Sequence, residues 1–141
     1  MLDGRIALVI ALLAPACDST KKDCEHAREV MASEWERNAK EAIVTVEAGQ
    51  RHALKTASAK EVTHLRRVFV DICVAQPERA RACIAKIDDF LRVKREQQTD
   101  NRHCGVHDAA CHAAAKPAAE SPLLDCEEPL DALMKAVSDG L

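Results

Sequence analysis

Apolar residues recur every three or four positions along most of the chain, and this spacing is typical of one face of an α-helix. The first such stretch lies between Lys21 and Ala48. Gly49 is expected to end it, because glycine adopts a left-handed helix cap at low cost. The apolar stripe consists of Ala27, Val30, Met31, Trp35, Ala39, Ala42, Ile43 and Val46. We expect Trp35 to hold this helix in the core.

Two further helices are predicted on either side of Pro77. Residues Ser58 to Glu61 match a capping box, in which a hydroxyl and a carboxylate each accept a hydrogen bond from a free backbone N–H, so a helix is expected to begin there. Its apolar face carries Val62, Leu65, Phe69, Ile72 and Cys73. Gln76 and Pro77 break the pattern, and proline suits the first position of the next helix. That helix has an apolar face of Ala80, Cys83, Ile84, Ile87, Phe90 and Leu91. So short a connection predicts an antiparallel hairpin.

The last third of the chain predicts shorter helices. A helix interrupted by Gly105 is expected between His103 and Ala115, followed by a linker around Pro117. The final helix begins near Asp125 or at Pro129, and its apolar positions are Leu130, Leu133, Met134 and Val137. No stretch shows strand alternation. We therefore predict an all-α protein, a small disulfide-stapled helical bundle of about four to five helices.

The N-terminus has the pattern of a targeting segment. Ile6 to Ala14 carries no charge and would span roughly 14 Å as a helix, about half of a bilayer core. This length is typical of the apolar region of a signal peptide and too short for a membrane-spanning helix. We predict a signal peptide at residues 1–16.

The segment Ala14-Pro15-Ala16-Cys17 resembles the lipobox of bacterial lipoproteins. The resemblance implies cleavage before Cys17 and attachment of lipid to that cysteine. The sequence departs from the usual pattern, because Leu13 stands one place early. Ala14 and Ala16 also match an ordinary secretory cleavage site at the same bond, and the protein would then be secreted.

The number of cysteines favours lipidation. Without Cys17 an even set remains: Cys24, Cys73, Cys83, Cys104, Cys111 and Cys126. Plain secretion would leave one unpaired thiol in an oxidising compartment. The expected organisation is a lipid-anchored linker at residues 17–23 and a single helical domain at residues 24–141.

Six cysteines allow 15 sets of three disulfides, and sequence alone does not choose among them. We expect Cys73 to pair with Cys83, because the two flank the Pro77 turn. Cys104 pairs with Cys111 if Gly105 breaks the helix, since seven residues of straight helix would separate the two by about 10.5 Å. Cys24 would then pair with Cys126 and join the first helix to the last. The spacing from Phe69 to Asp88 resembles uncharacterised, helical, cysteine-paired lipoproteins of some high-GC bacteria, a resemblance that implies no activity.

A cluster of histidine and cysteine is the one candidate site for a metal. Cys104, His107, Cys111 and His112 lie close in sequence, and the first three share a helix face. Thiolate and imidazole ligands suit zinc or copper. The competing interpretation is a structural disulfide beside surface histidines. His26, His52 and His64 are scattered and expected to be exposed.

Composition and motifs exclude several classes of function. The net charge of -3 lacks the basic surface of a nucleic-acid binder, and 2% aromatic residues give few stacking platforms. Arg66, Arg67, Arg79 and Arg81 are expected to be solvated, with contact to anionic headgroups as the alternative. The sequence contains no H-E-x-x-H or G-x-S-x-G motif.

We therefore expect a lipid-anchored cell-envelope protein with a binding or structural role, at the periplasmic or outer-membrane face. It would have no catalytic activity, no cofactor and no nucleic-acid partner. Lipid on Cys17 would attach it to the membrane, and an envelope protein would be its partner. The alternative is a metal-binding protein that uses the cluster at residues 103–112.

Overall fold

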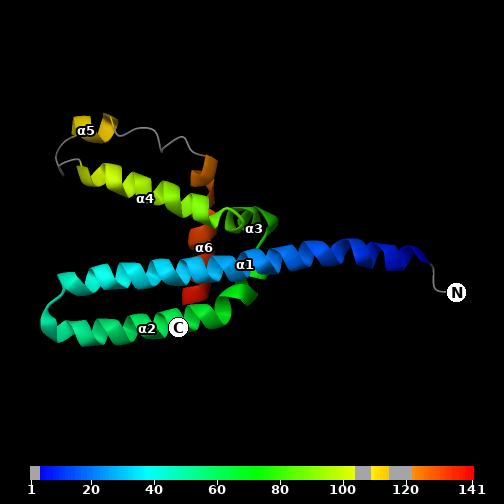
Figure 1. The fold of residues 1–141 in the computed structure, drawn as a ribbon, viewed down its shortest axis with the longest axis horizontal. Helices are drawn as coiled ribbons and strands as arrows, with labels where there is room; N and C mark the ends of the chain where they lie inside the picture. Colours follow the sequence, from blue (N-terminus) through cyan, green and yellow to red (C-terminus); the bar gives the residue numbers. More distant parts are fainter. Residues whose placement is uncertain (1–3, 104–108, 115–121) are drawn as a thin grey trace.

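The structure is a computed structural model that describes residues 4–103, 109–114 and 122–141 (Figure 1). Its elements in chain order are α1 (Gly4–Thr45), α2 (Ala48–Val74), α3 (Glu78–Ile84), α4 (Ile87–His103), α5 (Ala109–Ala114), the 3-10 helix η2 (Pro122–Cys126) and α6 (Glu127–Ser138). No strand occurs within these ranges. The prediction of an all-α, disulfide-stapled bundle is therefore confirmed.

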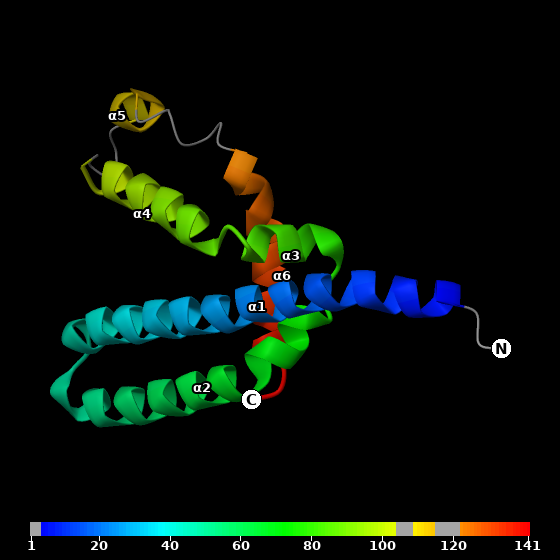
Figure 2. The ribbon, with the colours of Figure 1, turned by 45° about the vertical axis from the view of Figure 1, so that its right-hand side comes forward.

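Helices α1 and α2 form a long antiparallel hairpin (Figures 1 and 2). The helix stop expected at Gly49 is wrong. α1 already ends at Thr45, whose hydroxyl donates to the carbonyl of Ala42 at 2.7 Å. Gly49 lies in the first turn of α2 and has no positive φ, so its conformational freedom is not used there. Residues 17–23 belong to α1 and continue directly into the part of the helix that carries Cys24.

The capping box expected at Ser58 is also wrong, because α2 runs through this segment without a break. Backbone N–H groups inside a continuous helix already bond to carbonyls one turn earlier, so Ser58 has no free donor to cap. The carboxylate of Glu61 instead accepts a hydrogen bond from the indole N–H of Trp35 at 2.8 Å. This bond joins α2 to α1, and Trp35, which was expected in the core, is partly buried and packs against it.

The predicted break at Gln76 and Pro77 is confirmed, since α2 ends at Val74 and α3 begins at Glu78. The single helix expected after it is divided into α3 and α4 by a turn at Ala85 and Lys86. The N–H of Lys86 donates to the carbonyl of Cys83 at 3.0 Å. This turn changes the direction of the chain, so that α3 and α4 do not form one long rod.

The core gathers where α6 crosses the hairpin (Figure 1). Phe69 of α2, Ile84 of α3 and Leu133 of α6 are almost completely buried there. The expected apolar stripe of the last helix is confirmed, because Leu130 and Val137 are buried as well. Helices from both ends of the chain thus share one apolar interior.

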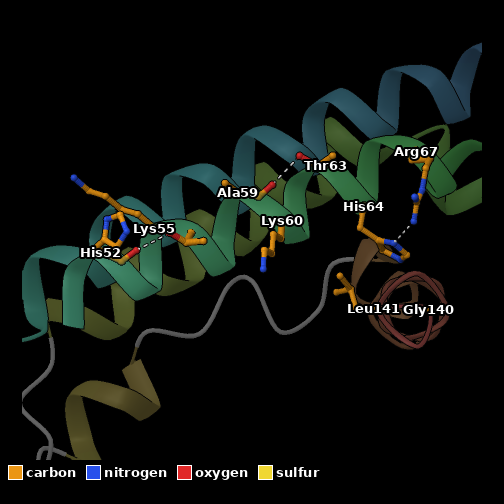
Figure 3. A pocket seen from close by; sticks show the side chains of 10 residues that line it. His52, Lys55, Ala59, Lys60, Thr63, His64, Arg67, Gly140 and Leu141 are labelled. Carbon is orange, nitrogen blue, oxygen red and sulfur yellow. Dashed lines mark hydrogen bonds between the residues drawn. The ribbon is translucent and has the colours of Figure 1, made fainter. Parts of the chain in front are cut away.

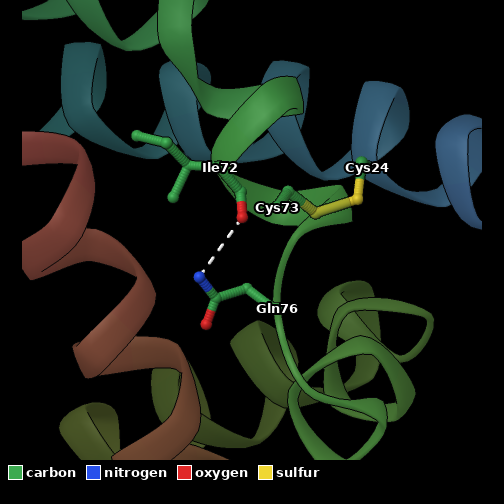
Figure 4. Close-up of a disulfide and its surroundings, with 4 residues drawn as sticks. All are labelled: Cys24, Ile72, Cys73 and Gln76. Atoms are coloured by element: carbon green, nitrogen blue, oxygen red, sulfur yellow. Dashed lines mark hydrogen bonds between the residues drawn. A yellow bond between two sulfur atoms is a disulfide. The ribbon is translucent and has the colours of Figure 1, made fainter.

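Two disulfides connect elements of this core. Cys24 of α1 is bonded to Cys73 of α2, with a Cα–Cα distance of 5.9 Å (Figure 4). Cys83 of α3 is bonded to Cys126 at the end of η2, with a Cα–Cα distance of 5.4 Å. The expected pairings of Cys73 with Cys83 and of Cys24 with Cys126 are therefore wrong.

The faces of the helices on which the cysteines lie explain why the two expected pairings are wrong. Cys73 lies one turn after Phe69, on the face of α2 that packs against α1, where Cys24 is equally buried. Cys83 lies beside Ile84 on the face of α3 that packs against η2 and α6. Proximity to the Pro77 turn indicated the distance between the two cysteines along the chain, but not the directions of their side chains.

Cys111 in α5 is also disulfide-bonded. Its expected partner, Cys104, lies outside the described residues, so this pairing stays a prediction. Every cysteine from Cys24 onward that the structure describes is therefore disulfide-bonded.

The cross-linked peptides that proteolysis releases from the unreduced protein are expected to include one pair joined through Cys24 and Cys73 and another joined through Cys83 and Cys126. The reason is that each pair of sulfur atoms is bonded between different helices. Mass spectrometry before and after reduction identifies the joined peptides. A peptide pair joined through Cys73 and Cys83 would contradict the observed connectivity.

Candidate functional site

Much of the α1–α2 hairpin lies outside the packed core. Every position from Ser33 to Glu61 is at least partly exposed, and Val44 has an exposed fraction of 73%. A two-helix segment buries only one stripe on each helix, and isolated helices are marginal in water. The segment around the turn therefore presents a large surface to solvent.

The outer face of α2, turned away from α1, forms an open groove with the end of α6 (Figure 3). We call it the α2 groove; its volume is about 770 Å³. It is lined by His52, Lys55, Thr56, Ala59, Lys60, Thr63, His64, Arg67, Gly140 and Leu141. The α2 residues among them follow the spacing of one helix face, and the small side chains of Ala59 and Thr63 lie between the longer cations.

The α2 groove is positively charged. Lys55, Lys60 and Arg67 line it, and none of its described lining side chains is acidic; the α-carboxylate of Leu141 is the one anionic group among these lining residues. Lys55 and Lys60 are exposed and form no ion pair with any residue that the structure describes. Cations without a nearby carboxylate attract anions from solution, because no internal partner neutralises them.

His64 connects this groove to the core. Its exposed fraction is 8%, which corrects the expectation that this histidine is exposed. Its Nε2 lies 2.8 Å from the carbonyl oxygen of Val137 in α6, so Nε2 carries the proton and donates. Its Nδ1 is then the acceptor for the guanidinium of Arg67 at 3.2 Å. One imidazole thus joins the end of α6 to α2 and holds Arg67 along the groove.

Gly140 permits this close packing at the end of α6. A Cβ atom at this position would lie 3.2 Å from Cε1 of His64, which is tighter than nine in ten real Cβ contacts. A larger residue would push the ring or the chain end outward. The absence of a side chain therefore helps to form the end wall of the α2 groove.

Neighbouring arginines of α2 have different surroundings. Arg66 faces α1, where it pairs with Glu36 at 3.3 Å and with Glu29 at 3.8 Å. It borders a second groove of about 430 Å³ between the two helices, whose floor includes Ala39 and Ile43. This second groove shares Lys55, Ala59 and Thr63 with the α2 groove, and it differs from it in having a carboxylate, Glu36, paired with a lining cation, Arg66.

Arg79, another of the four arginines considered for contact with headgroups, lies among acidic side chains. The surface around it is formed by Asp125, Glu127, Glu128 and Asp131. These carboxylates neutralise the cation, so this surface is not a basic patch. Of the arginines singled out in the sequence, Arg67 alone lines the α2 groove.

The structure does not assemble the expected metal site within the residues that it describes. Cys104 and His107 lie outside those residues, and nothing is described of the side chain of His112. Cys111 is disulfide-bonded, so its sulfur is not a free thiolate ligand. No group of three potential metal ligands occurs in the described part of the chain.

Other expected features are placed as follows. His26 is exposed, and its Nε2 lies 2.6 Å from a carboxylate oxygen of Asp88. Cys17 lies in α1. In the part of the chain that the structure describes, we find no helix with both the length and the apolar character that a membrane span requires.

Comparison with known proteins finds no matching family model, no similar curated protein and no similar solved structure. The residues themselves must therefore carry any functional argument.

The sequence does contain a signal for the α2 groove that periodicity analysis of apolar residues missed. No acidic residue occurs from Ala48 to Lys60, although acids and bases alternate over most of the chain. Within that stretch His52, Lys55 and Lys60 fall on one side of a helix, and Arg67 extends the same side. A search for charge periodicity would have identified this face.

Substitution of His64 by alanine is expected to lower the free energy of unfolding by about 1–3 kcal/mol, because it removes a buried bridge between α2 and α6. Urea denaturation followed by circular dichroism measures the change. His52→Ala is the matched control, since the His52 ring is exposed, and it should change stability by less than about 0.5 kcal/mol. Equal effects of the two substitutions would refute the structural role of His64.

Proposed function

We propose that this chain is an exported, lipid-anchored helical protein of the cell envelope, with a binding role and no catalytic step. The observation that carries the proposal is the pair of buried disulfides, Cys24–Cys73 and Cys83–Cys126. Disulfides form and persist in oxidising compartments and are rare in the reducing cytosol. The uncharged leader from Ile6 to Ala14 is a segment of the kind that delivers a chain to such a compartment.

Cys17 is the proposed site of lipid attachment. Four of the seven cysteines pair with one another, and Cys111 is disulfide-bonded as well. With Cys104 as the partner that spacing predicts for Cys111, Cys17 is left over for acylation. Each buried CH₂ of an acyl chain contributes roughly 0.8 kcal/mol, so two or three chains hold a protein firmly on a bilayer.

A binding role is supported by the shape of the molecule. The disulfides and the core lie at one end of the α1–α2 hairpin, whereas the segment from Ser33 to Glu61 contains no buried residue. The α2 groove continues along this exposed segment and carries unpaired cations. A rigid end joined to an exposed arm is an arrangement suited to contact with another component of the envelope.

Binding of zinc or copper at residues 103–112 is the rival proposal. The disulfide at Cys111 weighs against it, because an oxidised sulfur is a poor ligand compared with a thiolate. The two proposals make opposite predictions for the oxidation state of the cysteines, and this difference is measurable.

A palmitate analogue supplied to cells that produce the wild-type protein is expected to label it, and Cys17→Ala should abolish the label, because that substitution removes the acylated sulfur. Gel fluorescence after covalent tagging of the analogue measures incorporation. His52→Ala, at an exposed position of α2, is the control and should keep its label. A wild-type protein that is cleaved but unlabelled would instead be an ordinary secreted protein.

The mature protein, unfolded without reductant, is expected to contain no free thiol, because its remaining six cysteines would all be paired. Reaction with a chromogenic disulfide reagent counts thiols, and elemental analysis measures bound metal. Two free thiols together with stoichiometric zinc or copper would replace the structural interpretation of Cys104 and Cys111 with the metal-binding one.

A further inference from the structure

We propose that the α2 groove is a second, non-covalent contact with the membrane, in which its cations bind the phosphate-bearing headgroups of an anionic bilayer. This inference deepens the proposed function, because it gives a lipid-anchored protein a defined surface that faces its own membrane. It rests on charge, on the position of α2 in the molecule and on one exposed apolar side chain.

The charge is concentrated on one face of α2. His52, Lys55, Lys60 and Arg67 line the groove over roughly 22 Å of helix, without an acidic residue among the described lining residues. Arg67 is held in place by Nδ1 of His64, whereas the two lysines have no described ion-pair partner. Each Lys or Arg near an anionic membrane surface strengthens binding about fivefold. Charge complementarity therefore selects an anionic surface.

The position of α2 permits such a contact. In both ribbon views α2 runs along one edge of the molecule, with the C-terminal end of the chain beside it, while α3 and α4 lie on the opposite side of α1 (Figures 1 and 2). The outer face of α2 can therefore approach a plane over its length. A lysine can lay its methylene stem on apolar material and keep its ammonium group at the headgroups.

Leu141 is the apolar side chain at the edge of the α2 groove. Its exposed fraction is 65%, and it lies next to His64 and Gly140 (Figure 3). Free inorganic anions gain little from such a side chain, but a lipid surface offers it acyl material just beneath the headgroups. The combination of cations with an exposed leucine favours a bilayer over a small dissolved anion.

The proposed lipid site is compatible with this orientation. α1 runs beside α2, and packed helices lie about 8–10 Å apart. Cys17 precedes Cys24 by seven residues, roughly 10 Å of helix beyond the disulfide to α2. Acyl chains on Cys17 therefore start about one helix diameter above the plane on which α2 would lie. The acyl chains and the cations of the α2 groove would then contact the same bilayer.

The test is co-sedimentation of the full chain carrying Cys17→Ala with lipid vesicles. One set of vesicles is phosphatidylcholine alone, and the other is rich in phosphatidylglycerol. The partition coefficient for the phosphatidylglycerol vesicles is divided by that for the phosphatidylcholine vesicles. This ratio measures the effect of headgroup charge on binding, because apolar insertion of the leader is common to both. The double substitution Lys55→Gln/Lys60→Gln is expected to lower that ratio by about 30-fold. Added salt should also lower the ratio for the chain that keeps both lysines.

The matched control is Arg79→Gln/Lys86→Gln, which removes the same charge from exposed positions outside the α2 groove. It should leave the ratio almost unchanged. Glutamine is a good helix former, so circular dichroism should show that both double variants keep their helicity and melting temperature.

Three results would overturn the proposal. They are an absence of preference for anionic vesicles, equal losses in the groove variant and the control, and complete displacement by inorganic phosphate at constant ionic strength. The last of these would assign a site for a soluble anion. Because the assay uses a chain that cannot be acylated, its failure leaves acylation at Cys17 untouched. Failure of palmitate labelling would likewise not alter a measured preference for anionic vesicles.

Discussion

The bond between Cys24 and Cys73 joins α1 and α2 at the end of the hairpin opposite its turn, and the rest of the structure is arranged around it. The helices of the hairpin carry many alanines, which bury little apolar area each, so their mutual packing contributes modestly to stability. A cross-link between residues 49 positions apart restricts the unfolded chain and makes that modest packing sufficient. The large buried side chains, Phe69 and Leu133 among them, gather at the same end.

Helix α6 is held at both of its ends. Cys126, directly before its first residue, is bonded to Cys83 of α3, and the carbonyl of Val137 in its last turn accepts from His64 of α2. Its apolar stripe packs between these two attachments. The short last helix therefore closes the core and also supplies the end wall of the α2 groove, so the surface that we assign to binding depends on the packing of the core.

Charged residues of α2 are divided between its two sides. Arg66 pairs with carboxylates of α1, and exposed ion pairs of this kind contribute at most about 1 kcal/mol to stability. Lys60 lines the α2 groove and Lys55 borders both grooves, and neither lysine contributes a described ion pair to the fold. Cations without an ion pair in the fold are available to bind an external anion. The proposed membrane contact is therefore assigned to the face of α2 that carries them.

The spacing of apolar residues determined the helical class, the break at Pro77 and the buried face of the last helix, because a stripe of period 3.6 requires a helix wherever it occurs. The cysteine count, seven in all, showed that an even set remains when Cys17 is set aside. Disulfide partners, the burial of His64 and the separation of Arg66 from Arg67 were decided only by the tertiary structure. The physical reason is that each depends on which helix packs against which face, and local periodicity gives a residue's direction relative to its own helix alone.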